Sequence, residues 1–369
     1  MIPWLAHLLR DLNEGMGYLR LFDYLSFRTV MVAMTTFLFS LAIGAPMIRL
    51  LHRRGMRDVV EDFGMVDVTT KRGTPTMGGL IIVFSFLGGY LLWCDMANPF
   101  TWLGLFTLLG FAGVGFVDDL GKVRGGSGRH GLSQKGKLLL QLTLAGIITW
   151  WVMASGNSPL PDELRTQLFL PFMKEPLLDL GWFYAPFMVF VILAVANSVN
   201  FADGMDGLAV VPVAISFMVY AVFAYVIGNE VFSTYLQFDY IRGTGEMAVI
   251  AGAVIGASLG FLWYNAYPAE VFMGDTGSMA LGGLLSVVII SLKQEILFVI
   301  VGGMFVIEGA SVLLQQEVGF KVLGRRLFLR APVHHAFERR GIAETKIVTR
   351  FWMLALFLGL IGLLSLKIR

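Results

Sequence analysis

The sequence predicts an all-α, polytopic membrane protein with about ten transmembrane helices. Of its 369 residues, 56% are hydrophobic and 15% are charged, and the mean hydropathy is +0.73. A soluble domain of this size could not cover so much apolar surface with so few charges. Apolar stretches of spanning length also recur along the whole chain. We therefore expect a single transmembrane domain over residues 1–369, with the lipid bilayer as its main solvent.

Ten apolar segments are expected to span the membrane. Several are rich in glycine, which favours close helix packing in lipid. The single cysteine, Cys94, leaves no disulfide framework and no cysteine-based metal site. The expected spans are 29–51, 76–93, 100–117, 137–155, 183–199, 208–227, 246–264, 278–292, 296–315 and 350–367.

Lysine and arginine are concentrated in three of the connections between these segments, at 49–75, 118–137 and 316–350. These are the first, third and ninth connections, whereas the even-numbered connections carry few basic residues. Because basic loops stay in the cytoplasm, the odd-numbered connections are expected there. Both termini should then lie on the periplasmic or extracellular side.

The polar motifs all fall in odd-numbered connections, so we expect an active site on the cytosolic face. "FVDDLGK" at 116–122 ends the third span with Asp118 and Asp119. A carboxylate pair suits Mg²⁺ or phosphate binding, although a polar helix end at the interface would look the same. "KRGTPTMGG" at 71–79 offers Lys71 and a Thr-Pro-Thr turn to an anion.

"NSVNFADGMDGLAV" at 197–210 is the next polar motif. As a helix, it would place four amide and acid side chains near one face; its glycines allow an irregular segment equally well. A structural turn is the alternative to recognition of a polar head group. The four side chains are those of Asn197, Asn200, Asp203 and Asp206.

"YNAYPAEVFMGDTGSMALGG" at 264–283 places Asp275 just before an apolar helix. Thr276 or Ser278 is expected to cap this helix, whose N-terminal amides would attract an anion. A cap explains neither Asn265 nor the run of glycines, and Phe272 could stack on a base. We therefore predict a site in which a carboxylate binds metal and backbone amides bind phosphate.

"RAPVHHAFERRG" at 330–341 contributes His334 and His335 within a basic loop. Adjacent histidines diverge on a helix, so contacts to phosphate or proton transfer are expected rather than chelation of one metal. Glu308 lies in the middle of a span, where a buried carboxylate could have a functional role or could simply form a helix–helix hydrogen bond. Carboxylates, basic groups and a base-stacking aromatic together indicate phosphoryl transfer between a cytosolic and a lipid substrate.

These motifs, in this order, resemble the phospho-N-acetylmuramoyl-pentapeptide transferases, a family within the polyprenyl-phosphate N-acetylhexosamine-1-phosphate transferases. The resemblance runs from about Leu25 to Arg369. It implies a Mg²⁺-dependent homodimer in the bacterial inner membrane, with no nucleic-acid partner. Its substrates would be UDP-N-acetylmuramoyl-pentapeptide and undecaprenyl phosphate, and its products lipid I and UMP.

The resemblance also implies roles for individual residues. Asp275 would bind the metal with Asp118, which is also the candidate base beside Asp119, and both histidines would contact the substrate near its pyrophosphate. Where the family usually has a third histidine, this chain has Ala336. The predicted substrate-binding residues are Lys71, Thr76, Lys135, Lys137, Asn197, Asn200, Asp203, Gly204, Met205, Asp206, Asn265, Phe272, Gln315 and Ala331.

Two alternatives remain open from the sequence. A sister enzyme that uses UDP-N-acetylglucosamine would need the same catalytic groups. A transporter would carry its acidic residues at the midplane of the membrane, often within inverted repeats, whereas here they gather at one face. The choice between direct attack and an aspartyl-phosphate intermediate is also open.

Overall fold

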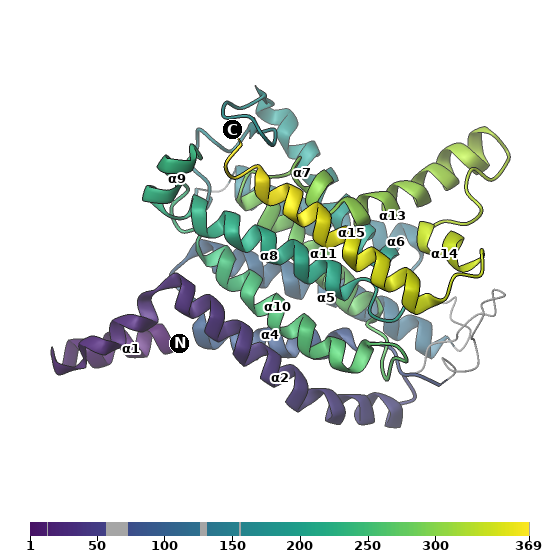
Figure 1. Cartoon of the computed structure of the whole chain (residues 1–369), viewed down its shortest axis with the longest axis horizontal. Coiled ribbons are helices and arrows are strands. Elements are labelled where there is room, and N and C mark those ends of the chain that lie inside the picture. The colour runs from purple at the N-terminus through teal and green to yellow at the C-terminus, as the bar shows by residue number, and fades with distance from the viewer. Residues whose placement is uncertain (13, 57–72, 126–130, 155, 369) are drawn as a thin grey trace.

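The computed structural model describes residues 1–12, 14–56, 73–125, 131–154 and 156–368. Within these ranges the chain is a bundle of long helices (Figure 1). A short antiparallel hairpin joins β1 (Gln167–Leu168) to β2 (Leu178–Asp179). The predicted all-α class is confirmed. The helices are α1 (Ile2–Leu12), η1 (Glu14–Asp23), α2 (Leu25–Arg53), α4 (Gly79–Trp93), α5 (Pro99–Arg124), α6 (Gln134–Met153), η2 (Gly181–Phe183), α7 (Tyr184–Ala202), α8 (Val210–Ile227), α9 (Glu230–Leu236), α10 (Glu246–Asn265), α11 (Gly274–Ser291), α12 (Phe298–Val301), α13 (Gly303–Leu313), η3 (Leu314–Val322), α14 (Val333–Glu338) and α15 (Glu344–Leu364).

Among the described residues, eight helices are long and apolar enough to cross a membrane. They are α2, α5, α6, α7 with η2, α8, α10, α11 and α15. The expected second span is the shorter α4, because residues 75–79 pair their backbone with residues 272–273 before the helix begins. The expected ninth span is divided at Gly302 into α12 and α13 and continues as a π-helix, η3.

Helix α11 forms the centre of the bundle and packs against α4, α5, α7 and α8. Every residue from Thr276 to Ser291 is buried. Glycines permit this packing: a Cβ at Gly79 would lie 2.1 Å from the Gly277 nitrogen, and one at Gly115 would lie 2.2 Å from the Asp275 carbonyl oxygen. The N-terminus of α11 is thereby held directly against α4 and α5.

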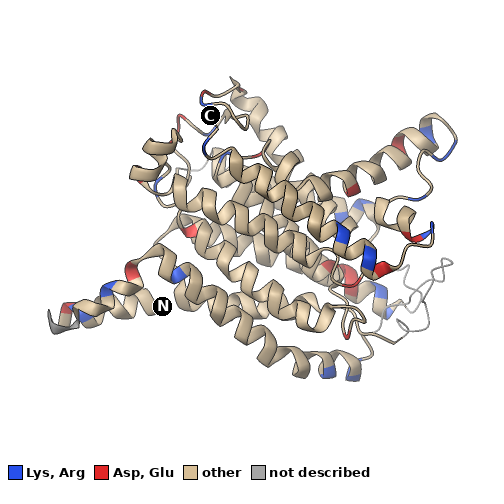
Figure 2. Cartoon of the chain, viewed as in Figure 1, with Lys and Arg blue, Asp and Glu red and all other residues tan. Residues whose placement is uncertain are grey.

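Charged residues are sparse in the middle of the bundle; one group lies at the end near α14, on the right of Figure 2, and others lie in α1 and near the C-terminus. The same end contains the C-terminus of α5 and the N-termini of α11 and α15 (Figure 1). The structure thus places the described parts of the polar motifs at one end of the bundle. Which side of the membrane this end faces stays a prediction.

Candidate active site

The N-terminus of α11 is capped by a carboxylate from another helix. Asp119, in the last turns of α5, accepts hydrogen bonds from the backbone N–H groups of Asp275 (3.1 Å) and Thr276 (2.9 Å). It also accepts one from the Thr276 hydroxyl at 2.7 Å. The predictions that Thr276 or Ser278 caps this helix and that its first amides are open to a phosphate are therefore wrong, because the amides at 275 and 276 bind Asp119. The Ser278 hydroxyl donates to the Gly274 carbonyl instead, because the terminal amides already have a buried acceptor.

Asp275 is held at the helix end by three donors from three helices. Its Oδ1 accepts a hydrogen bond from the Asn200 side chain at 2.8 Å. Its Oδ2 accepts from Lys122 at 2.9 Å and from Lys137 at 2.5 Å. Asn200 lies in the last turn of α7, Lys122 in that of α5, and Lys137 in the first turn of α6. Residues far apart in sequence thus meet at one carboxylate.

Asp118 shares the same two lysines. Its Oδ2 lies 2.9 Å from the Lys122 Nζ and 3.4 Å from the Lys137 Nζ. Its Oδ1 accepts a hydrogen bond from the Leu132 backbone at 2.8 Å. A buried and a partly buried carboxylate therefore converge on two ammonium groups, and each charge compensates the desolvation of the others.

The donor set of this cluster fits Mg²⁺. The ion prefers oxygen ligands and is usually bound by one or two carboxylates, with water and substrate phosphates completing its shell. Asp118 and Asp275 already direct oxygens at a shared cation, the Lys122 ammonium. Among the described residues, no group of three or more His, Cys, Asp or Glu side chains could hold a metal. A divalent ion here would depend on phosphate oxygens as well as these two carboxylates.

Residues 75–78 form a strap that precedes α4 and runs along the N-terminus of α11. The Phe272 N–H donates to the Pro75 carbonyl at 2.9 Å, and the Gly78 N–H donates to the Phe272 carbonyl at 2.8 Å. Gly274 has a φ of +72°, and a Cβ there would lie 2.8 Å from Asp119 Oδ2 and 3.0 Å from the Thr76 hydroxyl. Only glycine fits this crossing. Thr76 and Phe272 are thus brought to the α11 N-terminus, whereas Lys71 lies outside the described residues.

The turn after α7 is held by its own set of contacts. The Asp206 N–H donates to Glu344 on α15 at 2.9 Å, and the Gly207 N–H donates to the Asn265 side chain at 3.0 Å. The Asp206 carboxylate accepts from the Ala269 N–H at 3.0 Å. Asp206, Asn265 and Met205 are buried, Asp203 is partly exposed and Gly204 is exposed. The predicted irregular segment thus presents Asp203 and Gly204 at the surface.

The two histidines differ in their surroundings. His334 is fully buried beside Glu308, with its Nδ1 3.2 Å from the Glu308 Oε2. The His335 side chain is 17% exposed, and its Nδ1 lies 3.0 Å from the Glu338 carboxylate. Burial lowers the pKa of His335, and the hydrogen bond with Glu338 opposes that shift. His335 is therefore a largely neutral imidazole near neutral pH.

Other predicted binding residues have neighbours within the protein. Asn197 and Gln141 exchange amide hydrogen bonds of 3.0 and 3.2 Å between α7 and α6. Gln315 accepts from the Leu327 and Phe328 backbones at 3.1 and 2.9 Å. Lys135 is exposed on the first turn of α6, and Ala331 is partly buried before the cis peptide bond to Pro332. Substrate contacts by these four residues stay predictions.

Lys122 is the main residue of the cluster that the sequence interpretation did not select. It follows Asp118 by four residues on one helix, the spacing at which a lysine and an aspartate meet. That spacing within "DDLGK" was the available signal. The approach of Lys122 to Asp275, 153 positions away, depends on the packing of α5 against α11.

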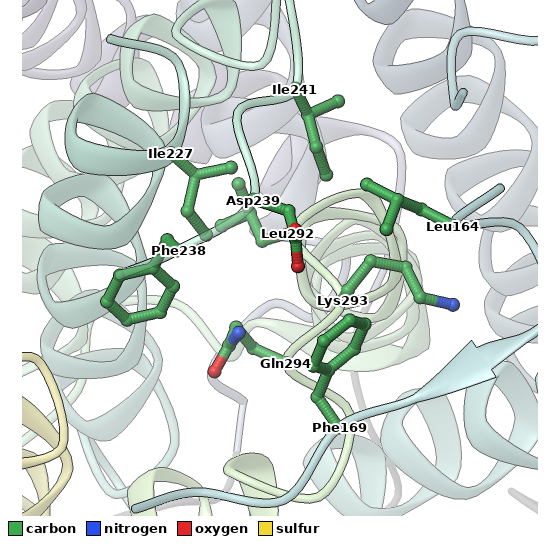
Figure 3. A pocket seen from close by; sticks show the side chains of 9 residues that line it. All are labelled: Leu164, Phe169, Ile227, Phe238, Asp239, Ile241, Leu292, Lys293 and Gln294. Atoms are coloured by element: carbon green, nitrogen blue, oxygen red, sulfur yellow. The ribbon is translucent and has the colours of Figure 1, made fainter. Parts of the chain in front are cut away.

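A second group of buried charges lies at the other end of α11. Lys293 stacks over the Tyr184 ring, 3.7 Å from its centroid, and lies 3.7 Å from Glu295. The pocket beside it holds about 10 Å³, enough for one water molecule and too small for a substrate. Figure 3 shows its lining of Leu164, Phe169, Ile227, Phe238, Asp239, Ile241, Leu292, Lys293 and Gln294.

An apolar cavity of about 310 Å³ lies between α13, α14 and α15. Val333 and Phe337, on either side of the histidine pair in α14, form part of its wall. The one charged residue in the wall is Arg350. Its lining is Met304, Ile307, Val333, Phe337, Ile342, Ile347, Arg350, Phe351 and Leu354.

Comparison with known proteins identifies the family. Residues 101–293 match the profile described as glycosyl transferase family 4, and residues 71–83 match phospho-N-acetylmuramoyl-pentapeptide-transferase signature 1. A phospho-N-acetylmuramoyl-pentapeptide-transferase of Ruegeria sp. (strain TM1040) is 45% identical over 370 residues, covering 100% of both chains. This chain belongs to the phospho-N-acetylmuramoyl-pentapeptide transferase family.

Two further members of the family show the same extent of similarity. The enzyme of that name from Desulfosudis oleivorans is 45% identical over 368 residues, covering 99% of this chain and 100% of its own. That from Ruegeria pomeroyi is 45% identical over 370 residues, covering 100% of both. The family resemblance proposed from the motifs is confirmed over the full chain.

Proposed function

We propose that this protein transfers phospho-N-acetylmuramoyl-pentapeptide from UDP-N-acetylmuramoyl-pentapeptide to undecaprenyl phosphate, forming lipid I and UMP. This is the first membrane step of peptidoglycan synthesis. The observation that carries the proposal is the convergence of Asp118, Asp275, Lys122 and Lys137 at one end of a helical membrane bundle. The full-length relatives bear the muramoyl name, which does not favour the N-acetylglucosamine alternative.

The reaction brings two anions together. An oxygen of the lipid phosphate forms a bond to the phosphorus of the sugar-linked phosphate. The anhydride P–O bond breaks, and its electron pair leaves with UMP. Positive charge must reduce the repulsion between the phosphates and stabilise the charge on the transferred group. Lys122 and Lys137 supply that positive charge beside the Asp275 carboxylate.

Direct attack by the lipid phosphate fits the cluster better than an aspartyl-phosphate intermediate. Both oxygens of Asp275 are engaged, Oδ1 by Asn200 and Oδ2 by the two lysines. A carboxylate held in this way suits a fixed anionic ligand more than a free nucleophile. Asp118 is the proposed base, which would take the proton of the acceptor phosphate on the Oδ2 that pairs with Lys122 and Lys137 in this structure.

Mg²⁺ is the proposed cofactor, with Asp275 and Asp118 as its protein ligands. When bound, the ion would act as a Lewis acid toward phosphate oxygens. Asp119 would not be a ligand, because its carboxylate caps α11 and keeps the Asp275 backbone in place. Lys122 and Lys137 would then be free to turn toward the phosphates.

The nucleotide is proposed to bind along the α7–α8 turn and the strap before α4. Asp203 and Gly204 are accessible there, and Phe272 and Thr76 lie beside the α11 N-terminus. Partly exposed aromatic side chains can stack on bases, which supports Phe272 as the uracil contact. Of the two histidines, His335 is the proposed contact to the pyrophosphate, because its side chain is 17% exposed whereas His334 is buried.

The apolar cavity beside α14 is the proposed site for the first part of the acceptor's isoprenoid chain. Its walls carry one charge, Arg350, and they include residues of the helix that carries both histidines. An apolar chain buried there would have its phosphate near that helix.

The lysine and arginine distribution supports a cytoplasmic orientation of this end, within the bacterial inner membrane. We also retain a homodimer as a proposal, on the strength of the family resemblance. Crosslinking in native membranes tests the dimer, and labelling of single cysteines from either side tests the orientation.

The catalytic cluster is tested by Asp275→Asn in the detergent-purified full chain. Asp162→Asn is the matched control, since that side chain is 84% exposed and pairs with Arg165, three positions along the chain. We expect Asp275→Asn to lower UMP release by at least about 10²-fold, because an electrostatic contact to the transferred group is lost. Near-native release by this variant, in protein with wild-type melting behaviour, would contradict the assignment.

A further inference from the structure

Glu308, whose position within an apolar helix suggested no partner, contacts His334. It lies in α13 and is fully buried, as is His334. Its Oε1 accepts a hydrogen bond from the His334 backbone N–H at 3.2 Å, and its Oε2 lies 3.2 Å from the His334 Nδ1. A buried carboxylate is costly unless polar groups surround it. Glu308 therefore accepts a hydrogen bond from the His334 backbone and places a carboxylate oxygen beside the His334 ring, although that oxygen and both ring nitrogens form no hydrogen bond with the described residues.

The other edge of the His334 ring lies against Gly204. A Cβ on Gly204 would be 2.3 Å from the His334 Nε2 and 2.9 Å from its Cε1. The φ of Gly204 is outside the left-handed region, so the close approach, rather than the backbone conformation, requires glycine here. The imidazole thus fills the space between Glu308 and the backbone of the α7–α8 turn.

Both ring nitrogens of His334 are buried, so the ring has no exposed atom to offer a substrate. Gly204 and the neighbouring Asp203, in contrast, are accessible. Beyond Gly204, the same turn is held by Glu344 and Asn265. His334 thus contacts the turn at Gly204, whereas Glu344 and Asn265 bind the N–H groups of Asp206 and Gly207.

We propose that Glu308 is a positioning residue, which acts through the buried His334 ring on the backbone at Gly204 and so fixes the nucleotide-binding turn. The proposal rests on the proposed function, in which residues 203–206 bind the UDP-sugar. The two histidines then have different roles: His334 supports the backbone of the turn at Gly204, and His335 contacts the substrate.

The first test is Glu308→Gln, with the Michaelis constant and kcat measured separately. Glutamine keeps the size of the side chain and an acceptor for the His334 backbone N–H, but removes the carboxylate charge that lies 3.2 Å from the ring Nδ1. We expect KM for the UDP-sugar to rise about tenfold while kcat falls less than about threefold, because a shifted turn weakens binding of the nucleotide. A loss of kcat at unchanged KM would overturn the proposal.

The matched control is Glu317→Gln on η3. This glutamate lies nine positions after Glu308, in the π-helix that directly continues α13, and forms an exposed ion pair with Lys321. Its removal should leave KM and kcat at wild-type values. An equal rise in KM for both variants would overturn a specific role for Glu308.

The contact between His334 and Gly204 is tested by a double-mutant cycle. Gly204→Ala should raise KM because its methyl group displaces the ring. Once His334→Ala has removed the ring, the added methyl should cost nothing further. The double variant should therefore match His334→Ala alone, whereas multiplicative effects would show that the two residues are independent and would overturn the proposal.

A readout that does not need activity separates this inference from the proposed function. Hydrogen–deuterium exchange of peptides that cover residues 203–207 should be faster in Glu308→Gln than in the wild type, at equal melting temperature. Unchanged exchange there would overturn the positioning role. Absence of transferase activity in the wild-type protein would instead contradict the proposed function and leave the exchange result valid.

Discussion

The carboxylate of Asp119 accepts two hydrogen bonds from Thr276, at 2.9 Å from the backbone N–H and 2.7 Å from the hydroxyl. The first residues of α11 are thereby fixed to the last turns of α5. Because Asp275 is the preceding residue, Asp119 sets where that carboxylate lies. Asp118 and Asp119 are adjacent in sequence but have different duties, one facing the lysines and the other capping a helix.

Asp119→Asn should destabilise the protein as well as inactivate it. An amide presents an N–H to donors that need an acceptor, so a charge-assisted interaction worth about 2 kcal/mol is lost. Thr276→Val removes only the hydroxyl and should cost about 1 kcal/mol. Thermal unfolding in detergent checks both. Equal melting temperatures for Asp119→Asn and the wild type would contradict the capping role.

Gly274→Ala tests the crossing of the strap over α11. The substitution forces an L-residue to a φ of +72° and places a methyl group 2.8 Å from Asp119 Oδ2. We expect a loss of roughly 1–3 kcal/mol together with most of the activity. Gly113→Ala is the control, because a Cβ at that position of α5 meets nothing within 4 Å. Equal melting temperatures for Gly274→Ala and Gly113→Ala would contradict the requirement for glycine at position 274.

Only part of this site could be predicted from the sequence. The gathering of Asp118, Asp275 and the histidine loop at one end follows from counting spans and basic loops, since span parity assigns each connection to a face. The duty of Asp119 could not be predicted, because it depends on how α5 packs against α11. The Asn197–Gln141 amide pair likewise depends on the rotation of α6 against α7.

The division of the ninth span and the late start of α4 also could not be predicted from the sequence. Residues 296–315 are continuous in hydropathy, yet the helix is divided at Gly302. The late start of α4 reflects backbone pairing with residues 272–273, a contact between segments about 200 positions apart. Apolar composition locates a span, but tertiary hydrogen bonds decide where its helix begins.

The lowered pKa of His335 predicts a pH-dependent contribution to stability. Burial makes the native protein bind this proton less tightly than the unfolded chain does. The contribution of the neutral ring to the free energy of unfolding is therefore complete above the pKa of about 6.5 in the unfolded chain. It is lost as the pH falls through the lower pKa of the native protein. The melting temperatures of wild type and His335→Asn, compared at several pH values, should differ less in acid. A difference that grows toward low pH would contradict this sign.

Leu354→Trp should change the KM of one substrate and leave the KM of the other unchanged. The larger side chain occupies part of the apolar cavity of about 310 Å³ beside α14, so KM for undecaprenyl phosphate should rise several-fold, on the order of what small changes to an apolar pocket cost. KM for the UDP-sugar should be unchanged, since the nucleotide is proposed to bind at the α7–α8 turn. Steady-state kinetics with each substrate varied in turn provide the check; a rise for the UDP-sugar alone would place the acceptor chain elsewhere.

The central claim is tested most directly by UMP release from the detergent-purified protein with undecaprenyl phosphate and Mg²⁺. UDP-N-acetylmuramoyl-pentapeptide and UDP-N-acetylglucosamine are offered in parallel, each with and without a chelator. We predict release from the muramoyl substrate alone, abolished by the chelator and restored by added Mg²⁺. Release from UDP-N-acetylglucosamine alone, or no release from either substrate by folded protein, would contradict the account.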